Sequence, residues 1–355
     1  VYTAEEAKEV ANRLKYPVLV RPSYVLGGQG MAIAYDDKDV ERLISDINQI
    51  AQEHPILVDK YMQGKEMEVD AISDGKDILI PGVMELLERA GIHSGDSISV
   101  YPTSIIDQKY IDKIVDYTKR IAKELNIIGL FNIQFIICEG EVYIIEVNPR
   151  ASRTIPYISK VTGLPVIDVA TRVILGEKLE DIGYGTGVYK KSEYVAVKMP
   201  IFSFQKLKNA DTSLGPEMKS TGEVLGVSKH FSQAILKAFI ASGINVTNRG
   251  KILVTVNDKD KPEILPIIKN LEKEGYEIYA TSGTAKFLKE NGVEDVKVVP
   301  KIWEGTNSIP NLIHSGKVSF IINTPTKGKE ANRDGFKIRR LAAESKVPCF
   351  TAIDT

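Results

Sequence analysis

Residues 130–148, "LFNIQFIICEGEVYIIEVN", restrict the fold more than any other stretch of the chain. Two long and mostly apolar segments flank Glu139 and Gly140. Segments of this kind on either side of a glycine-containing turn are typical of a β-hairpin. We expect the loop to consist of the three residues 139–141, because three-residue hairpin loops with glycine are common.

Polar residues alternate along both strands of this hairpin, and residues two apart on a strand share a face. With a three-residue loop, Gln134 lies opposite Glu146, and Asn132 lies opposite Asn148. A two-residue loop would shift the register by one and put Gln134 on the other face from Glu146. In the first register, four oxygen-bearing side chains gather on one face of a largely apolar hairpin.

Carboxylate and carboxamide oxygens are ligands that suit Mg²⁺ or Mn²⁺, which also bind phosphate oxygens and water. The same pattern fits an edge strand with a solvated polar face and no metal. Spacing alone leaves both interpretations open, because an isolated Glu-x-Asn is a weak signal.

Two neighbouring features point to phosphate. "VRPSYVLGGQGM" places Arg21 at a strand end, before glycines whose backbone N–H groups can approach an anion closely. "NPRASRT" adds Arg150 and Arg153, and arginines bind phosphoryl oxygens in a fork geometry that lysine lacks. Each feature alone also fits a simple turn or a pair of surface arginines. Together with the hairpin they predict a phosphoryl-transfer site that relies on metal and arginine charge.

Periodicity along the remaining chain predicts a multidomain protein of α/β and α+β class. A helix over 3–15 opens with a capping box formed by Thr3 and Glu6. From residue 251 onward, strands alternate with helices, which indicates a small parallel α/β domain. We expect three parts, namely 1–186, a connecting region 187–243, and 244–355. The other expected strands are 16–23, 32–36, 56–62, 66–75, 77–87, 193–202, 251–256, 276–280, 296–300, 318–324 and 348–353. The other expected helices are 39–54, 107–125, 164–176, 228–243, 261–274, 283–291 and 335–345. A loop is expected over 210–226.

Bulk properties exclude several classes of protein. The net charge of −1 argues against general binding to nucleic acid or to an anionic membrane, and no apolar run is long enough to span a bilayer. Cys138 and Cys349 are too few for a disulfide framework or a metal cluster, which fits a reducing cytoplasm. Because "VYTAEEAKEV" is neither a signal peptide nor a natural start, we expect the chain to be a fragment of a longer protein.

Several motifs in a fixed order resemble the large subunit of carbamoyl phosphate synthetase. They are "PVLVRPSYVLGGQGM", "GIHSGDS", "NIQF", "IIEVNPRASRT", "GPEMKSTGEVLG" and, further on, "ILVTVNDKDK", "YATSGTAKFL" and "IINT". The resemblance covers nearly the whole chain. It implies an incomplete ATP-grasp unit with a mixed antiparallel sheet, the second and carbamoyl-phosphate-forming unit of that family. A small parallel α/β domain of the methylglyoxal-synthase-like fold follows it.

The resemblance also implies residue roles. Arg150 and Arg153 would face the phosphoryl and carbamate groups as catalytic residues. Gln134, Glu146 and Asn148 would hold Mg²⁺ or Mn²⁺. The residues that would bind ATP are Arg21, Lys60, Met62, Glu66, Gly91, Ile92, His93, Ser94, Gln134 and Glu146. Taken singly, a histidine such as His93 is more often an ordinary loop residue than a ligand, and a methionine such as Met62 is more often a core residue than an adenine contact. Lys60 lies where relatives often carry other residues.

By the same resemblance, the activity is that of a ligase, a glutamine-hydrolysing carbamoyl phosphate synthase of arginine and pyrimidine biosynthesis. ATP would phosphorylate carbamate, which an upstream unit makes from bicarbonate and ammonia released by a glutaminase small subunit. The isolated chain is therefore not expected to make carbamoyl phosphate from glutamine. Two alternatives stay open, namely another ATP-grasp ligase of carboxylase type and a nucleotide-sensing fragment without catalysis.

The second domain carries "TSGT" at 281–284, where a strand ends and a helix begins. Hydroxyl and backbone N–H groups at such a position bind phosphate well, although a plain helix cap is the simpler interpretation. The resemblance implies an allosteric pocket for UMP, IMP or a related nucleotide, with ornithine acting nearby in some members. Its expected residues are Lys261, Thr281, Thr284, Lys301 and Asn323. Pro325 departs from the family pattern, which leaves the effector open, and we expect binding without catalysis.

Overall fold

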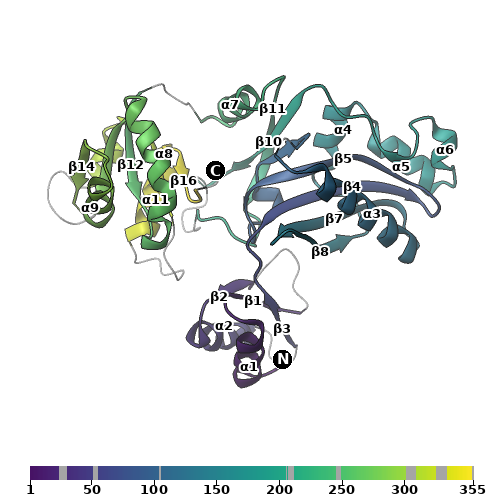
Figure 1. Cartoon of the computed structure of the whole chain (residues 1–355), viewed down its shortest axis with the longest axis horizontal. Helices are drawn as coiled ribbons and strands as arrows, with labels where there is room; N and C mark the ends of the chain where they lie inside the picture. The colour runs from purple at the N-terminus through teal and green to yellow at the C-terminus, as the bar shows by residue number, and fades with distance from the viewer. Residues whose placement is uncertain are drawn as a thin grey trace. The chain divides into compact units, whose positions relative to one another are not determined.

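The computed structural model describes residues 1–23, 30–50, 55–103, 105–204, 206, 212–244, 249–300, 309–324 and 334–353. The chain forms two compact units (Figure 1). The first comprises 1–200, 214–220 and 227–234, and the second comprises 201–213, 221–226 and 235–355. The predicted divisions after residues 186 and 243 stay predictions.

The first unit begins with a small sheet covered by two helices. Its elements are α1 (Ala4–Leu14), β1 (Val18–Pro22), β2 (Ala32–Ala34), α2 (Asp37–Ile50) and β3 (Ile56–Lys60), with antiparallel strands in the order β2-β1-β3. Thr3 caps α1 as predicted, since its hydroxyl accepts from the Glu6 N–H at 3.1 Å. The Glu6 carboxylate accepts from the Tyr2 N–H instead of the Thr3 N–H, so the capping box is only half formed.

The larger sheet, most of which belongs to this unit, has eight strands in the order β11-β10-β6-β5-β4-β7-β8, with β9 beside β5. Its strands are β4 (Lys65–Asp74), β5 (Ile78–Arg89), β6 (Ser99–Tyr101), β7 (Ile128–Cys138), β8 (Glu141–Asn148), β9 (Gly187–Val188), β10 (Val195–Phe202) and β11 (Ser220–Ser228). The pairs β4–β5, β4–β7, β7–β8, β5–β6 and β6–β10 are antiparallel, whereas β9 runs parallel to β5. The predicted mixed antiparallel sheet is therefore confirmed.

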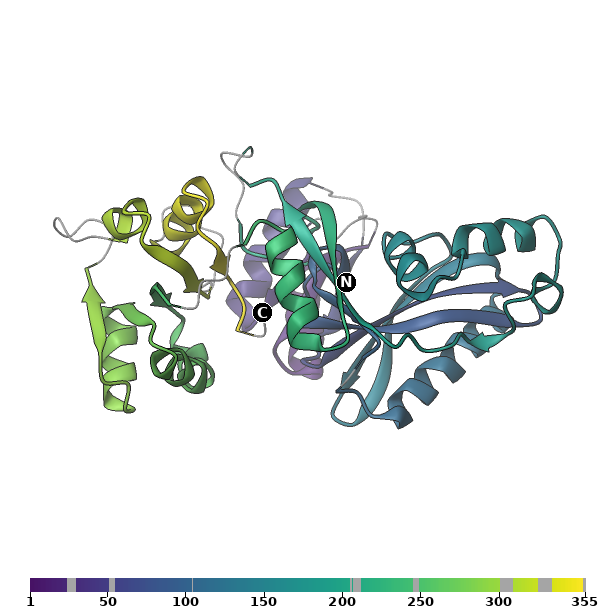
Figure 2. The same cartoon turned by 90° about the horizontal axis from the view of Figure 1, so that it is seen from above.

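Helices cover both faces of this sheet (Figure 2). The helix α3 (Gln108–Glu124) packs through Ile114 and Ala122 on the face that carries Met67 and Val69. The helices α4 (Ile155–Thr162), α5 (Val166–Ile174) and α6 (Leu179–Ile182) pack near Ile72 on the other face. Because side chains alternate along a strand, Glu66, Glu68 and Asp70 share this second face with Ile72.

The loop between β7 and β8 differs from its prediction. Cys138 pairs with Glu141, so the turn holds only Glu139 and Gly140. Both have positive φ angles, of 52° and 81°. These angles suit a two-residue type I′ turn, whose twist matches that of the flanking strands. The prediction of a three-residue loop was wrong because this conformation suits glycine and is tolerated at the preceding residue.

A β-bulge corrects the register that the short turn would otherwise impose. Phe135 pairs with Ile144, but Gln134 pairs with Glu146, which leaves Ile145 as the extra residue. One extra residue shifts the alternation by one position. Glu146 consequently shares a face with Gln134, so the predicted pairing is confirmed although its predicted cause was wrong.

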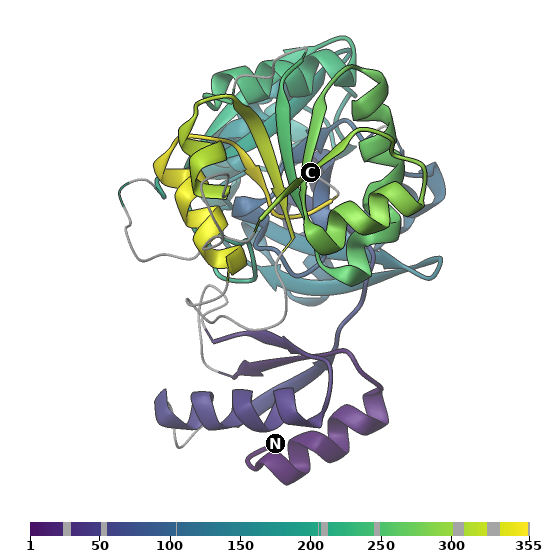
Figure 3. The ribbon, with the colours of Figure 1, turned by 90° about the vertical axis from the view of Figure 1, so that its left-hand side faces the viewer.

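The second unit contains a five-stranded parallel sheet in the order β14-β13-β12-β15-β16, shown in green and yellow in Figure 3. Its elements are β12 (Lys251–Thr255), α8 (Lys261–Lys273), β13 (Glu277–Thr281), α9 (Ser282–Glu290), β14 (Val296–Val299), α10 (Ile309–His314), β15 (Val318–Asn323), α11 (Asp334–Glu344) and β16 (Cys349–Phe350). The helices α8 and α9 pack on one face, and α10 and α11 pack on the other. The predicted parallel α/β domain is confirmed, although α10 was not predicted.

The segment that precedes the parallel sheet in the sequence departs from its prediction at one strand. Residues 210–226 were expected to be a loop, but β11 begins at Ser220 and lies beside β10. Gly222 and Gly226 interrupt the apolar alternation of β11, so its periodicity does not indicate a strand. The helix α7 (Phe231–Ala241) follows as expected. Among the described residues, no helix combines the length and the apolar character needed to cross a membrane.

Candidate functional site

Two rows of polar side chains cross three neighbouring strands of the large sheet. Each row takes one residue from β4, one from β7 and one from β8, joined by the strand register. The rows are Glu68–Gln134–Glu146 and Asp70–Asn132–Asn148. The second row confirms the predicted pairing of Asn132 with Asn148. Six polar side chains thus occupy one continuous area of the sheet.

The inner part of both rows is buried and hydrogen bonded. Glu68, Asp70 and Asn132 are each at most 2% exposed. The Asn132 amide nitrogen donates to Glu68 Oε1 at 2.8 Å and to Asp70 Oδ1 at 3.0 Å. The Thr154 hydroxyl donates to Asp70 Oδ2 at 2.5 Å. One amide and one hydroxyl therefore hold two carboxyl groups together in the interior.

Burial raises the pKa of both carboxyl groups above its ordinary value, because the interior disfavours the charged form. The neighbouring Asp70 raises the pKa of Glu68 further, whereas the ammonium group of Lys198 opposes the rise. Hydrogen bonds from Ser152 and Thr154, together with the charge of Arg150, oppose the rise at Asp70. Glu68 Oε2 has no hydrogen-bond partner among the described residues.

The outer part of the rows offers oxygen atoms. The Gln134 amide nitrogen donates to Ser94 Oγ at 3.1 Å, and the Asn148 amide nitrogen donates to Glu146 Oε1 at 2.8 Å. Both amides therefore direct their nitrogen to a protein acceptor and keep their carbonyl oxygen for another partner. With the exposed Glu146 carboxylate, these oxygens form the hard donor set that suits Mg²⁺ or Mn²⁺.

No group of three or more His, Cys, Asp or Glu side chains in the described part of the chain could hold a metal ion by itself. A cation on these rows would accordingly depend on carboxamide oxygens, phosphate oxygens and water as well as on Glu146. This dependence fits a metal that arrives with a nucleotide.

The predicted arginines follow directly on β8. The Arg150 N–H donates to the Asn148 carbonyl at 2.8 Å, which turns the chain at the strand end. Arg150 and Arg153 are both exposed, whereas Thr154, the next residue, is buried. The arginines therefore lie at the solvent-facing end of the polar rows.

The predicted nucleotide loop lies against β4. The Gly91 N–H donates to Glu66 Oε1 at 3.1 Å, and Glu66 is 7% exposed. Burial raises the pKa of Glu66 to about 7, against the opposing hydrogen bond from Gly91. Gly91 has φ 95°, and a Cβ there would lie 3.2 Å from the Tyr61 ring, so both backbone and space require glycine.

His93 and Ser94 continue this loop. The Gly95 N–H donates to His93 Nδ1 at 3.0 Å, so the unprotonated nitrogen of a neutral imidazole faces the loop. Burial lowers the pKa of His93, which favours that neutral form. Lys198 on β10, 1% exposed, donates to the Ser94 carbonyl at 3.2 Å. Ile92 is half-buried in the same loop.

A buried carboxylate joins this loop to β11. Asp96 is fully buried, and its two oxygens accept from the Lys219 and Ser220 N–H groups, each at 2.8 Å. The His93 N–H donates to the Gly215 carbonyl at 2.9 Å. The motifs "GIHSGDS" and "GPEMKSTGEVLG", more than 110 residues apart, therefore form one structural element.

The remaining predicted ATP residues lie on or near the small sheet. Arg21 pairs with Asp59 at 3.1 Å, and both side chains are partly exposed. Lys60 donates to the Lys15 carbonyl at 2.6 Å, at the end of α1. Met62 is half-buried between β3 and β4. The glycine loop at 24–29 lies outside the described residues.

The sequence interpretation missed the buried half of the site, namely Glu68, Asp70, Thr154 and Lys198. One signal was present, because "KEMEVDAISD" places Glu66, Glu68 and Asp70 at every second position. Three acids on one face of a strand whose other face is apolar indicate a polar centre. Thr154 and Lys198 gave no such signal, because only the fold brings them to β4.

Four of the five predicted effector residues are described. Thr281 ends β13 and caps α9, Asn323 ends β15, and Thr284 is buried in the first turn of α9. The Lys261 ammonium group donates to the Gly283 carbonyl at 3.0 Å. The carboxyl ends of β13 and β15 and the start of α9 thus lie at one edge of the parallel sheet. Lys301 lies outside the described residues.

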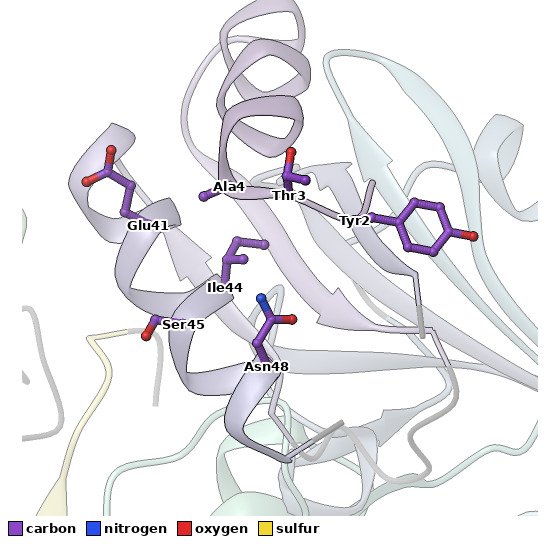
Figure 4. A pocket seen from close by; sticks show the side chains of 7 residues that line it. All are labelled: Tyr2, Thr3, Ala4, Glu41, Ile44, Ser45 and Asn48. Atoms are coloured by element: carbon purple, nitrogen blue, oxygen red, sulfur yellow. The ribbon is translucent and has the colours of Figure 1, made fainter. Parts of the chain in front are cut away.

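A separate pocket of about 520 Å³ lies between the start of α1 and the helix α2 (Figure 4). Tyr2, Thr3 and Ala4 line one side, and Glu41, Ile44, Ser45 and Asn48 line the other. Its one acid, Glu41, already pairs with Lys8 at 2.6 Å. None of the residues of the polar rows lines this pocket, so it is not the candidate site.

Comparison with known proteins agrees with this geometry. The sequence profile for "Carbamoyl-phosphate synthase L chain, ATP binding domain" matches residues 1–182, and that for "MGS-like domain" matches residues 263–351. The carbamoyl phosphate synthase large chain of Lachnoclostridium phytofermentans is 57% identical over 355 residues, which is 100% of this chain and 33% of that protein. The large chain of Agathobacter rectalis is 55% identical over 356 residues, with the same coverage. The chain thus spans about a third of the length of these relatives.

Among solved structures, the biotin carboxylase of Campylobacter jejuni, in its "beta-gamma-ATP" complex, matches with a TM-score of 0.53 at 19% identity. The match covers 67% of this chain and 59% of that one. It shows a shared fold, and the expected ATP-grasp-like architecture is confirmed. Because the first profile covers just over half of its residues, the chain belongs to the family of the carbamoyl-phosphate synthase L chain ATP-binding domain.

Proposed function

We propose that these residues form the carboxyl-terminal third of a carbamoyl phosphate synthase large chain, and that they transfer the γ-phosphoryl group of ATP to carbamate. The observation that carries this proposal is the pair of polar rows on β4, β7 and β8, which ends at Arg150 and Arg153. The identity of more than half the residues with such large chains, over the whole length, supports it.

In the proposed reaction, a carbamate oxygen forms a bond to the γ-phosphorus while the bond from that phosphorus to the ADP oxygen breaks. Positioning and charge neutralisation carry such a transfer, because the protein forms no covalent bond. Bound Mg²⁺ supplies positive charge to the phosphate oxygens. Mn²⁺ fits the same oxygen donors, which are Gln134, Glu146 and Asn148.

The other residues bind and orient. Arg150 and Arg153 neutralise the phosphoryl and carbamate oxygens at the solvent-facing end of the rows. Glu66 accepts from the ribose hydroxyls when ionised, and its pKa of about 7 places that state near neutral pH. The loop of Gly91, Ile92, His93 and Ser94 lines the nucleotide site, to which Arg21, Lys60 and Met62 contribute from the segment before β4.

The proposed partner is a glutaminase small subunit, reached through the rest of the large chain, and the proposed substrates are ATP and carbamate derived from bicarbonate. The net reaction is then that of the glutamine-hydrolysing ligase, which the isolated chain would not complete. A cytoplasmic location is proposed because Cys138 and Cys349 are both free thiols.

The reverse half-reaction tests this proposal most directly, because it needs neither glutamine nor bicarbonate. The full-length large chain, supplied with MgADP and carbamoyl phosphate, is expected to form ATP, measured with luciferase. A Glu146→Ala variant is expected to lose at least about 100-fold of this rate, the scale of losing one charge-stabilising group. Because an upstream ATP site could contribute to the signal, the variant is the decisive measurement. Unchanged ATP formation by Glu146→Ala would refute the metal role of the rows.

The second unit is proposed to bind an allosteric nucleotide, UMP or IMP, at the edge formed by Lys261, Thr281, Thr284 and Asn323, with Lys301 as a further contact and ornithine as an alternative effector. Thermal-shift measurements on the whole chain with UMP, IMP and ornithine test this effector site. The Thr284→Val variant is measured beside the wild type, because it removes one of the proposed contacts. No shift with any of the three ligands would contradict an effector site.

A further inference from the structure

Thr154 occupies an unusual position for a helix-capping residue. It is the N-cap of α4, yet its side chain makes no capping hydrogen bond. A threonine at this position ordinarily accepts from an N–H group of the first helical turn. Here the hydroxyl faces the buried carboxyl groups of β4 and lies 2.5 Å from Asp70 Oδ2. The start of α4 thus forgoes a cap in favour of a contact 84 residues away in the sequence.

The hydrogen bonds around Thr154 link it to Asp70 and to Ser152. The Thr154 hydroxyl donates its single proton to Asp70 Oδ2. Ser152 Oγ lies 2.7 Å from Thr154 Oγ1, a contact in which either hydroxyl can donate. Ser152 Oγ in turn accepts from the Thr154 N–H at 3.1 Å. These bonds close a small ring of residues 152–154 over the buried acid.

This ring fixes one end of the arginine loop, residues 149–153. The other end is fixed by the bond from the Arg150 N–H to the Asn148 carbonyl. Between the two attachments the loop exposes both arginines. A short loop held at each end has few conformations to lose when the arginines bind an anion.

We propose that Asp70 and Thr154 are positioning residues that hold the arginine loop over the outer end of the polar rows. The inference rests on the proposed phosphoryl transfer, because the loop acts there. Asp70 supplies the acceptor, Thr154 transmits its position to the chain, and Asn132 keeps Asp70 beside Glu68. None of these side chains has to touch the substrate.

The test compares Thr154→Val with two matched variants of the full-length large chain in the ATP-forming reverse reaction. Thr154→Val keeps the volume and removes the hydroxyl, whereas Thr154→Ser keeps the hydroxyl. Thr118→Val removes another fully buried hydroxyl, which donates to the Ile114 carbonyl within α3 at 2.8 Å. Calorimetric titration with MgADP gives the number of sites in each protein, and because the upstream site is common to all variants, the difference from the wild type counts the sites lost in this unit.

Thr154→Val is expected to lower kcat per MgADP-binding site about 10- to 100-fold, the scale of misplaced reacting groups. The KM for carbamoyl phosphate should rise, while the Kd for MgADP stays within about twofold. Thr154→Ser should restore kcat to within about threefold, and Thr118→Val should match the wild type. A merely structural role would reduce the number of sites and leave kcat per site unchanged, which would overturn the proposal.

Three further outcomes are decisive. If Thr154→Val loses all MgADP binding beyond that of the upstream site, the milder Ser152→Ala variant replaces it, and an unchanged kcat per site would overturn the positioning role. If the wild type and Glu146→Ala form ATP at the same rate, the proposed function fails, and the inference fails with it. A Glu146-dependent wild-type activity that Thr154→Val matches overturns the positioning role alone.

Discussion

Replacement of Asp96 by Asn is the perturbation whose consequence the structure defines best. Both carboxylate oxygens of Asp96 accept from backbone N–H groups, of Lys219 and Ser220, and the side chain is fully buried. An asparagine keeps one oxygen and turns an amide nitrogen towards the second N–H group. Two donors then face each other without an acceptor.

The magnitude follows from these contacts. A hydrogen bond to a charged acceptor contributes about 1.5–3 kcal/mol, and a buried unsatisfied donor costs about 1–3 kcal/mol more. We therefore expect Asp96→Asn to destabilise the junction between the loop of residues 91–97 and β11 by about 3–5 kcal/mol. Since about 1.4 kcal/mol is tenfold, the opening equilibrium of this junction should increase at least about 100-fold.

Hydrogen exchange at the Lys219 and Ser220 amides measures this opening without requiring two-state unfolding of a multidomain chain. Asp107→Asn is the matched control, because Asp107 caps α3 without a side-chain capping bond. The control should change exchange by less than about threefold, within the range of surface substitutions. If the Lys219 and Ser220 amides are as protected from exchange in Asp96→Asn as in the control, their hydrogen bonds to Asp96 do not stabilise this junction.

Three further predictions concern pH, packing and metal. Burial raises the pKa of Glu88 to about 7 from an ordinary 4.5, so its protonated form favours folding. The stability that this protonated form contributes is complete below pH 4.5 and is lost as pH rises through 7. Glu88→Gln should remove up to about 3 kcal/mol of this decline in the free energy of unfolding. A Cβ at Gly82 would lie 2.2 Å from the Tyr101 ring, so Gly82→Ala should destabilise the chain by about 1–3 kcal/mol in denaturant unfolding. Chelation with EDTA should abolish ATP formation from MgADP and carbamoyl phosphate, and added Mg²⁺ or Mn²⁺ should restore it.

Each of these has a contrary result. A parallel pH dependence of stability in Glu88→Gln and the wild type would show that Glu88 does not titrate as inferred. Gly215→Ala serves as control for Gly82→Ala, because a Cβ at Gly215 meets nothing within 4 Å; equal stability of the two variants would contradict the steric argument. ATP formation that persists in EDTA would contradict a metal bound through Gln134, Glu146 and Asn148.

Local patterns were sufficient for much of the fold. The alternation of strands and helices after residue 251 predicted the parallel sheet, because the periods of strand and helix are properties of short segments. Polar residues two apart in "IIEVN" placed Glu146 and Asn148 on one face for the same reason. The glycines of β11 break its apolar periodicity, and the sequence interpretation therefore expected a loop. Pairing with β10 allows a strand there.

The hairpin register shows where local reasoning ends. Glu139 and Gly140 adopt a two-residue turn, and only the bulge at Ile145 returns Glu146 to the face of Gln134. A bulge depends on the packing of both strands at once, with Val142 on the α3 side of the sheet. The right pairing was thus predicted from a wrong loop.

The sequence by itself determined the types of element, the polar strand ends and the arginines that follow them, because each is written within a few neighbouring residues. Only the tertiary structure decided that Asp70 meets Thr154, that Asp96 holds β11, and that Lys198 reaches the loop of residues 91–97. These partners are 84 to 124 residues apart along the chain. Buried polar groups need hydrogen-bond partners, but which distant residues supply them depends on how the sheet and its loops pack.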